Sequence, residues 1–379
     1  MVWCNAPIRL TKLLIRKLEF MMMVKNLKYY GLAVLVSASM LVQAGNPERA
    51  GQAGAAALLI NPYARNSGMW GSNSARVRGL EAQFLNVAGT AYTRKTELMF
   101  NRTSWLSGTG IFLNSFGFTQ GLGETGTIGL GFVSLNSGKI EITTEDQPEG
   151  GLGTYQYTAY NVNLSYAKMF SENIFGGINV KLISEQIPNV SARGIAVDAG
   201  IQYHTGKYDQ MHLGITLKNW GPKMSYQGDG LARQMNVKYG NNYEMTVNNR
   251  SAAFELPALV NIGVAYDIFM TKDTTGALSK KNRLSVNAAF QSNSFTYDNY
   301  LLGLEYAWKE MIMVRAGLYT EKGIFKGGTE RMTVFTGPAM GASFELPFNE
   351  KKSTVALDYS YRFTNPFSGV HSFGFRVNL

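Results

Sequence analysis

Few residues in this sequence have the types and the spacing that catalysis or cofactor binding requires. Gly121, Gly123 and Gly126 fit the G-x-G-x-x-G pattern of dinucleotide-binding loops, but such a loop must follow a strand and open a helix. Here the pattern joins two runs of alternating apolar and polar residues, so we interpret it as a turn. The G-x-S-x-G motif that presents a nucleophilic serine does not occur.

Candidate metal ligands are equally sparse. His204 and His212 flank one short turn and are able to approach each other, whereas His371 stands near the end of the chain. Two histidines without carboxylates make a poor metal site, and we interpret them as turn-proximal or lumen-facing side chains. The acidic residues in 145–149 lie beside two glycines, and a solvated loop explains them better than a calcium site. We therefore expect no enzyme, no metal and no cofactor.

Composition limits the class of protein. Charged residues make up 16% of the 379 residues, against about a quarter in an ordinary soluble domain. Disordered chains are charge-rich and aromatic-poor, so 20 Tyr and 21 Phe exclude disorder. A helical membrane protein needs several apolar stretches of about 20 residues, which a mean hydropathy of -0.10 does not allow. A soluble β-protein and an outer-membrane barrel remain.

Residues 1–44 are predicted to be a signal peptide. Residues 29–42 form an apolar run without charges, preceded by two lysines and followed by the small residue Ala44. This order and length match an export signal. Three consecutive methionines end at Met23, so we interpret residues 1–22 as an extension upstream of the true start.

Removal of the signal peptide changes the chemistry expected of the exported chain. The leader contains six bases and one acid, and its loss leaves 30 bases and 25 acids. Such a balance argues against a nucleic-acid partner, which requires clustered bases. The single cysteine, Cys4, is lost with the leader, so the exported chain has no thiolate and no disulfide.

From about residue 97 onward, apolar and polar residues alternate. In residues 355–363 (VALDYSYRF) nearly every second side chain is large and apolar, which is the pattern of a strand with one apolar and one polar face. Runs of this kind predict fourteen strands, near residues 97–104, 111–118, 127–135, 155–170, 174–184, 194–204, 211–220, 255–269, 282–294, 300–308, 311–319, 336–346, 354–363 and 371–379.

The strand count and the connectors favour an all-β fold, a 14-stranded antiparallel transmembrane barrel over residues 97–379. Bacterial single-chain barrels have an even number of strands, with short turns at the periplasmic end. If both ends of the barrel lie in the periplasm, the even-numbered connectors should be short. Most of them are, whereas the long connectors 136–154, 221–254 and 320–335 fall on the other side; the twelve residues 270–281 are an exception.

Two further features favour a barrel over a secreted two-sheet sandwich, whose strands would alternate as well. The chain ends on a strand, and tryptophans lie at strand ends, where interfacial aromatic girdles belong; these are Trp105, Trp220 and Trp308. Side chains expected to face lipid or a partner barrel are Leu357, Tyr359, Tyr361, Phe373, Phe375 and Val377. Side chains expected to face the lumen are Asp358, Ser360, Arg362 and Arg376.

Residues 45–96 do not alternate. A small, apolar run at 53–60 (AGAAALLI) is broken by Asn61 and Pro62 and leads into a Gly- and Ser-rich stretch. We predict that this segment is an amino-terminal plug or hatch inserted into the lumen.

The same segment carries a family resemblance. Residues 53–69 (AGAAALLINPYARNSGM) and 80–91 (LEAQFLNVAGTA) resemble the opening of the PorV/PorQ family of Bacteroidetes, which has a Gly-Met-Gly and an Asn-Pro-Ala. Trp70 interrupts the first motif and Val87 replaces the proline of the second, so the chain is identified as a divergent member. The motif positions are Asn61, Pro62, Arg65, Gly68, Met69 and Asn86.

The resemblance implies a FadL-like fold in the cell outer membrane and a role as an accessory of the type IX secretion system. Its partners would then be the translocon barrel, the carboxy-terminal signal domains of secreted cargo, and outer-membrane lipid. The alternative is a FadL-like transporter of hydrophobic small molecules, which should have an apolar binding pocket near the plug.

Connector 221–254 has an interface-like composition, rich in Met and Tyr. These side chains either contact a partner or fold the loop onto itself. We predict that the partner-binding residues are Tyr226, Met235, Tyr239, Tyr243 and Met245.

Overall fold

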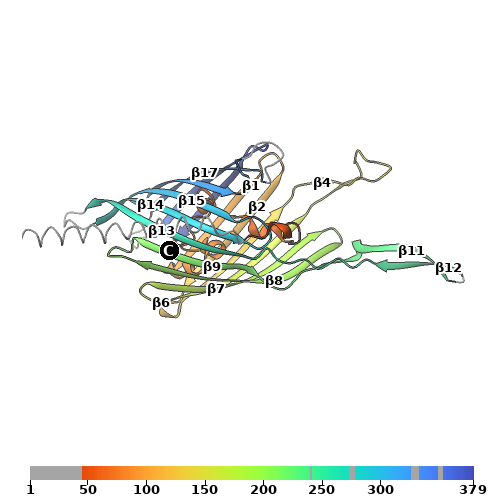
Figure 1. Ribbon diagram of the computed structural model, residues 1–379, viewed down its shortest axis with the longest axis horizontal. Coiled ribbons are helices and arrows are strands. Elements are labelled where there is room, and N and C mark those ends of the chain that lie inside the picture. The colour runs from red at the N-terminus through yellow and green to blue at the C-terminus, as the bar shows by residue number, and fades with distance from the viewer. Residues whose placement is uncertain (1–44, 240, 273–277, 326–332, 349–352) are drawn as a thin grey trace, which may run out of the picture. The chain divides into compact units, whose positions relative to one another are not determined.

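Fourteen long strands form the wall of the protein (Figure 1). The structure is a computed structural model that describes residues 45–239, 241–272, 278–325, 333–348 and 353–379. The strands of the wall are β1 (Thr96–Trp105), β2 (Ile111–Gly121), β3 (Thr127–Asn136), β6 (Thr158–Ser171), β7 (Ile174–Ile187), β8 (Val190–Thr205), β9 (Met211–Trp220), β13 (Leu259–Lys272), β14 (Leu278–Asn293), β15 (Asn299–Trp308), β16 (Ile312–Glu321), β17 (Phe335–Pro347), β18 (Thr354–Thr364) and β19 (Val370–Asn378).

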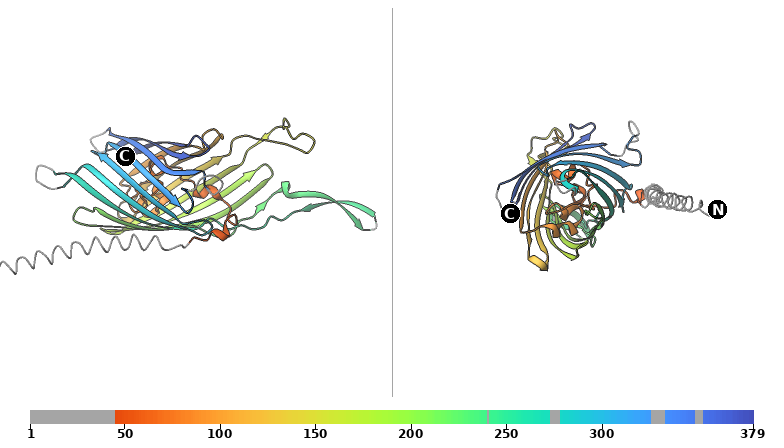
Figure 2. Two further views of the ribbon diagram at one scale, coloured as in Figure 1. Left: turned by 45° about the horizontal axis from the view of Figure 1, so that its top comes forward. Right: turned by 90° about the vertical axis from the view of Figure 1, so that its left-hand side faces the viewer.

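Antiparallel pairing continues around the whole ring. The first strand, β1, pairs with the last strand, β19, and β8 pairs with β9, so the sheet closes on itself. Figure 2 shows the closed ring in its end-on view. Closure leaves no unpaired strand edge, which is what a sheet in lipid requires. The predicted 14-stranded antiparallel barrel is therefore confirmed, and its strand ends agree with the prediction to within four residues.

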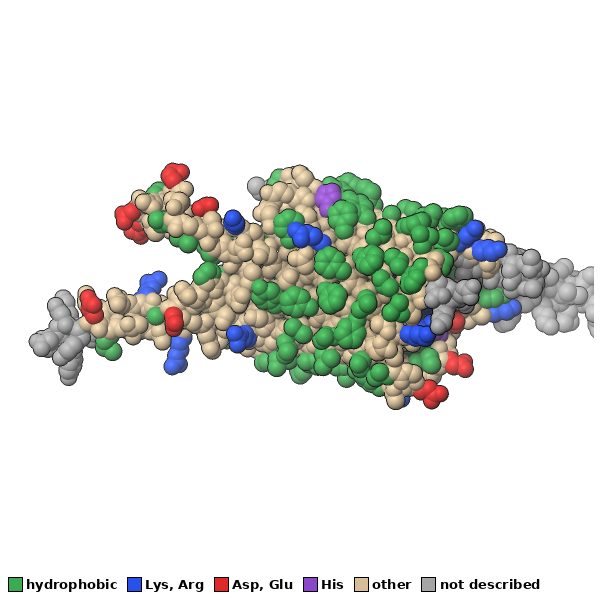
Figure 3. All heavy atoms as spheres, turned by 180° about the vertical axis from the view of Figure 1, so that it is seen from behind, with side chains coloured by type: hydrophobic (Ala, Val, Ile, Leu, Met, Phe, Trp, Pro, Cys, Tyr) green, Lys and Arg blue, Asp and Glu red, His purple; other side chains and the backbone are tan. Residues whose placement is uncertain are grey.

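The two faces of the wall differ in chemistry, as the alternation predicts. On the outside, Leu357 is 59% exposed and Phe373 is 58% exposed, whereas the inward-facing Asp358 is 5% exposed. Hydrophobic side chains cover the outer surface of the barrel in Figure 3, and charged side chains lie mainly toward its two ends. An apolar outer face of this kind is what contact with lipid requires.

The tryptophan prediction is correct for two positions and wrong for one. Trp220 and Trp308 are exposed at strand ends, at 65% and 41%. Trp105 instead faces the lumen. The reason is the register of β1, in which the odd-numbered residues Met99 and Asn101 are buried and the residues between them are exposed.

The longest connectors all lie at one end of the barrel. At the other end the strands are joined by short turns such as 172–173 and 309–311, whereas connectors 137–157 and 221–258 project from the first end, which also has short turns such as 188–189 (Figure 1). Connectors 137–157 and 221–258 contain short strands that the alternation did not predict. They are β4 (Ile140–Glu141) with β5 (Thr154–Tyr155), β10 (Tyr226–Gln227), and β11 (Ala232–Tyr239) with β12 (Asn241–Asn248).

In the described residues, the helices each span only three to six residues. They are η1 (Pro47–Arg49), η2 (Ala56–Leu59), α2 (Ala64–Ser67), α3 (Ala82–Leu85), η3 (Val87–Tyr92), η4 (Gly123–Thr125) and η5 (Asp229–Leu231). Because η4 lies inside the G-x-G-x-x-G pattern and joins β2 to β3, that pattern is a turn, as interpreted. No helix within the described residues is long and apolar enough to cross a membrane. The predicted signal peptide, residues 1–44, lies outside the described residues.

Candidate functional site

Residues 45–95, which we call the amino-terminal segment, begin at the rim of the barrel and then run inside the ring of strands (Figure 2). Several family-motif positions fasten this segment. Asn61 accepts a hydrogen bond at Oδ1 from the amide of Tyr63 at 3.0 Å, and the carbonyl of Pro62 accepts one from the hydroxyl of Thr103 in β1 at 3.5 Å. Arg65 lies 3.8 Å from the buried carboxylate of Glu81. The contact of Pro62 with Thr103 places the segment against the wall, whereas the other two contacts hold the segment together. Its action as a plug stays a prediction.

Gly68 and Met69 bring the main chain of the segment into direct contact with the main chain of the wall. A Cβ atom added at Gly68 would lie 3.0 Å from Cα of Gly341 in β17, and one added at Gly317 in β16 would lie 2.7 Å from Cα of Met69. Glycine is needed where two main chains approach this closely. The Gly-Met part of the family motif therefore has a packing role.

Asn86 holds the other half of the segment to β8. Its Nδ2 donates to the carbonyl of Ile201 at 3.0 Å, and its Oδ1 accepts from the amide of Ala88, which caps η3. Gly200 and Gly214 leave the space that the Asn86 side chain occupies, since a Cβ at either position would run into it.

Ion pairs tie the segment to two further strands of the ring, β13 and β15. Arg76 lies 3.1 Å from Asp267 in β13 and 3.1 Å from Glu305 in β15. Glu305 also binds Arg283 at 2.9 Å and Arg315 at 2.6 Å. A cavity of about 780 Å³ borders this network at the end of the barrel with short connectors. Its lining contains five arginines and six carboxylates, so it is an aqueous vestibule rather than an apolar site.

A second cavity, of about 530 Å³, lies between the segment and the wall at the end with long connectors. We call it the aromatic cavity. Exposed residues such as Pro47 and Thr296 belong to its lining, so it reaches solvent. Its apolar walls are made by Leu59, Ile60, Trp70, Phe84, Leu85, Trp105, Leu259, Leu301, Tyr319 and Phe335. The polar part of the lining consists of asparagine and glutamine amides, several hydroxyl groups, and the charged side chains of Lys218, Glu321 and Arg362. Apolar walls with a few convergent polar groups are typical of small-molecule sites.

Two buried cations face the aromatic cavity, Lys218 from β9 and Arg362 from β18. The Lys218 ammonium lies 3.8 Å from the ring centroid of Phe84, and the Arg362 guanidinium lies 5.1 Å from that of Trp105. Within the described part of the chain, neither forms an ion pair or a hydrogen bond. Sequence reasoning assigned Arg362 to the lumen but did not identify this cavity. The sequence signal that could have indicated this cavity was a lysine or arginine at an inward-facing position of a strand.

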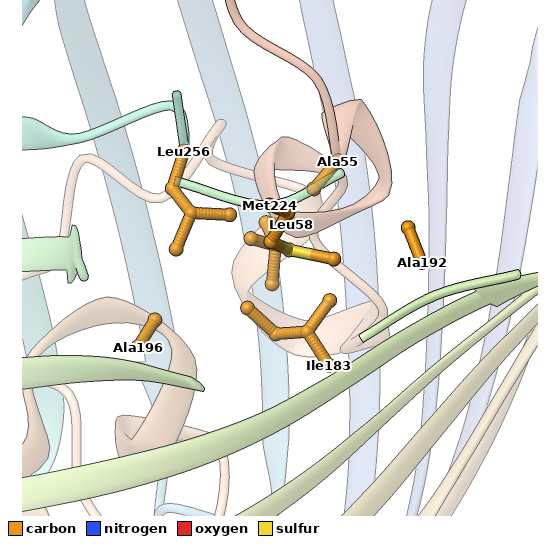
Figure 4. Packing of buried hydrophobic residues seen from close by; sticks show 7 residues of the cluster. All are labelled: Ala55, Leu58, Ile183, Ala192, Ala196, Met224 and Leu256. Atoms are coloured by element: carbon orange, nitrogen blue, oxygen red, sulfur yellow. The ribbon is translucent and has the colours of Figure 1, made fainter. Parts of the chain in front are cut away.

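The predicted partner-binding residues divide into three groups. Tyr226 is half-buried; its hydroxyl donates to Glu185 at 2.8 Å, and its ring packs with Phe254 against the apolar cluster of Figure 4, which contains Met224. Met235 and Met245 are 54% and 52% exposed and lie opposite each other across β11 and β12. The side chains of Tyr239 and Tyr243 lie outside the described part of the chain.

Two carboxylates organise the base of connector 221–258. Glu185 accepts hydrogen bonds from Tyr157 and Tyr226, and burial followed by these bonds raises the pKa of both phenols. Glu255 binds Arg49 at 2.8 Å and Lys223 at 3.3 Å. The hydrogen bond from Arg49, then that from Lys223, holds the pKa of the Glu255 carboxyl below its usual range.

The histidines do not assemble a metal site in the described residues. The rings of His204 and His212 lie 6.2 Å apart, and His212 Nε2 lies 3.5 Å from Asp267. His371 pairs with the hydroxyl of Tyr359 at 2.9 Å. No group of three or more His, Cys, Asp or Glu in the described residues is placed to hold a metal ion.

Comparison with known proteins adds evidence on the fold. The chain is similar to the toluene transporter TodX of Pseudomonas putida, with a TM-score of 0.53 at 11% identity, and to the monoaromatic hydrocarbon channel CymD, with a TM-score of 0.50 at 13% identity. Each match covers 84% of this chain and 97% of the other. A FadL homologue of Pseudomonas aeruginosa aligns over the same shares with a TM-score of 0.47 at 11% identity. No family model and no curated protein sequence matches the chain.

The similarities to TodX and CymD support the barrel fold. The closed ring and its apolar outer face are those of a barrel in the outer membrane. TodX is a transporter and CymD is a channel by name. At 11% and 13% identity the likeness shows the fold alone, and the PorV/PorQ assignment with its secretion role stays a prediction.

Proposed function

We propose that this protein is an outer-membrane channel that binds hydrophobic small molecules in the aromatic cavity and passes them along the amino-terminal segment. The observation that carries the proposal is the cavity itself, which is apolar, open to solvent at the end with long connectors, and bounded by the segment. This cavity is the apolar pocket near the segment that the transporter alternative requires. The TodX-like and CymD-like fold agrees with this choice.

The segment separates two environments of opposite character. The aromatic cavity lies on one side of it and the charged vestibule lies on the other. An apolar molecule is stabilised in the aromatic cavity, where its surface leaves water. It is destabilised in the charged vestibule, because it cannot form hydrogen bonds with the charged groups there. The aromatic cavity is thus the binding site. Passage of the bound molecule from this cavity to the vestibule requires a shift of the amino-terminal segment.

A cavity-filling substitution tests the proposal. Gln291 lines the cavity from β14, so Gln291→Trp should obstruct it and lower the initial rate of toluene uptake several-fold in cells that contain the protein. Ser292→Trp is the matched control, since the next residue of the same strand faces outward, where tryptophan is tolerated. Uptake that is equal in wild type and both variants would contradict a route through this cavity.

The secretion role remains a second candidate because of the pair Met235 and Met245. Both methionines are exposed on the hairpin of β11 and β12, which projects beyond the wall (Figure 1). Burial of exposed, adaptable Met side chains by a protein partner is energetically favourable. The partners implied by the resemblance are the type IX translocon barrel and the signal domains of secreted cargo.

Deletion of this hairpin tests the second candidate. Replacing residues 233–247 by a short Gly/Ser linker removes both methionines and leaves the buried Met224 and Tyr226 in place. If the hairpin binds a partner, the variant inserts normally but no longer co-purifies with translocon or cargo. A similar shortening of residues 142–152 is the control. Unchanged co-purification after removal of 233–247 would exclude the hairpin from such binding.

A further inference from the structure

We propose that the aromatic cavity is specific for aromatic carboxylates, and that the ligand's carboxylate binds the guanidinium of Arg362. The proposal rests on the proposed function of the cavity as a small-molecule site and names the chemistry of its ligand. The proposed ligand differs from a neutral aromatic hydrocarbon in one group, its carboxylate.

Unpaired hydrogen-bond donors converge at one place in the cavity. Nε and Nη2 of Arg362 are buried without a partner, and so is the indole Nε1 of Trp70, whose ring centroid lies 5.5 Å from the guanidinium carbon. Buried donors are almost always satisfied, so an unpaired cluster points to a missing acceptor. Because one of these donors is charged, the acceptor that fits best is an anion.

Arg362 is an exception among the arginines of the lumen. The described residues contain four buried arginines, and three of them bind carboxylates. Arg283 binds Glu305 and Glu310, Arg315 binds Glu305, and Arg376 binds Glu345. Arg362 is 4% exposed, and its guanidinium lies near the rings of Trp70, Trp105 and Phe335 without an ion pair in the described residues. An unpaired buried charge is costly, and binding of a ligand carboxylate would offset that cost.

The aromatic walls of the cavity favour a ligand whose apolar part is a flat aromatic ring. Trp70, Tyr319 and Phe335 form a connected group in which Trp70 lies 4.9 Å from Tyr319 and 4.7 Å from Phe335 between ring centroids. Trp105 extends the group, at 5.7 Å from Phe335. Flat rings offer stacking and edge contacts to another flat ring. A rigid ring also loses less conformational freedom on binding than an alkyl chain does.

The remaining charges of the cavity agree with an anionic ligand. Lys218 adds a second basic group, and among the described residues of the lining the only carboxylate, that of Glu321, accepts a hydrogen bond from the Tyr319 hydroxyl at 2.6 Å. Within these described residues, basic groups outnumber carboxylates two to one. A volume of about 530 Å³ falls within the usual range of ligand pockets.

Calorimetric titration of the purified, folded protein with 2-naphthoate tests the proposal, with 2-naphthamide as a neutral analogue of the same shape. Wild type should bind the acid at least about tenfold more tightly than the amide, as expected for a charge-assisted contact. Arg362→Met should remove this preference and leave amide binding unchanged. Arg102→Met is the matched control, because Arg102 stacks on Phe112 at 4.6 Å but is exposed on the outer face.

A stability measurement separates ligand binding from a structural role. If Arg362 serves a ligand, Arg362→Met should raise the thermal unfolding midpoint, because it removes an unpaired buried charge. A lowered midpoint with equal loss of acid and amide binding would overturn the proposal. So would equal affinity for acid and amide in wild type, or binding of decanoate as tight as that of 2-naphthoate. Failure of every probe to bind wild type would instead refute the proposed function of the cavity.

Discussion

Replacement of Gly317 by alanine would test the contact between the amino-terminal segment and the wall. The new Cβ atom would lie 2.7 Å from Cα of Met69 and 2.9 Å from its carbonyl carbon. Ordinary van der Waals contact begins at 3.4 Å. Both opposing atoms belong to the main chain, so no change of side-chain rotamer relieves the overlap. The segment and β16 must separate by about 0.7 Å, the difference between 3.4 and 2.7 Å.

The structure also sets the magnitude of the effect. Overpacking of an interior costs about 1–3 kcal/mol, and we expect the upper half of that range here. The segment cannot simply slide, because Gly68 is in contact with Gly341 in β17 and the ion pairs of Arg76 hold the segment to β13 and β15. Guanidinium unfolding of the folded barrel measures the free energy, and the fluorescence of Trp70, next to Met69, reports on the contact.

Gly131→Ala provides the control. Gly131 also faces the lumen, but its added Cβ would meet the flexible end of the Gln83 side chain rather than main chain. We expect a loss below about 1 kcal/mol, since a side chain relaxes more readily. If Gly317→Ala unfolds like wild type, or costs no more than Gly131→Ala, the segment is not held by direct main-chain contact and the packing role of the Gly-Met motif is refuted.

Three further predictions concern the ion pairs and the lipid face. Arg76→Met should lower the free energy of unfolding by about 2 kcal/mol, below the 3–5 kcal/mol of a fully broken buried pair, because Asp267 and Glu305 keep other cationic partners; no loss would mean that Arg76 does not anchor the segment. Phe375→Lys on the outer face should cost about 2–4 kcal/mol in lipid vesicles, whereas Gln291→Lys in the solvent-connected cavity should cost far less; equal losses would invert the assigned faces. The pKa of Glu255 is depressed in the folded protein, so its stabilising effect is present above the ordinary carboxyl pKa and is lost as the pH falls through the folded pKa. The protection factors of the amides of residues 46–53, which are ratios of intrinsic to observed exchange rates and so are corrected for the intrinsic pH dependence of exchange, should therefore fall on acidification in wild type but not in Glu255→Gln, and identical profiles would contradict the prediction.

The sequence by itself determined the wall of this protein. Side chains of a strand point alternately to the two sides, so a period of two in residues 355–363 specifies both a strand and its faces. The same local rule places Phe375 outside and Arg362 inside, as the structure confirms. Because a closed sheet in lipid must pair every strand, the fourteen alternating runs and the order of short and long connectors already led to the barrel.

Only the tertiary structure decided what the inward-facing residues meet. Alternation predicts that Arg362 faces the lumen, but not that it lacks a carboxylate while Arg315 has one, because partners on other strands depend on register and on the path of the segment. Tyr226 was predicted to bind a partner, with a loop folded onto itself as the alternative, and its hydroxyl donates to Glu185, which is 41 positions away in the sequence. Contacts of this kind join residues that are distant along the chain, and no local period records them.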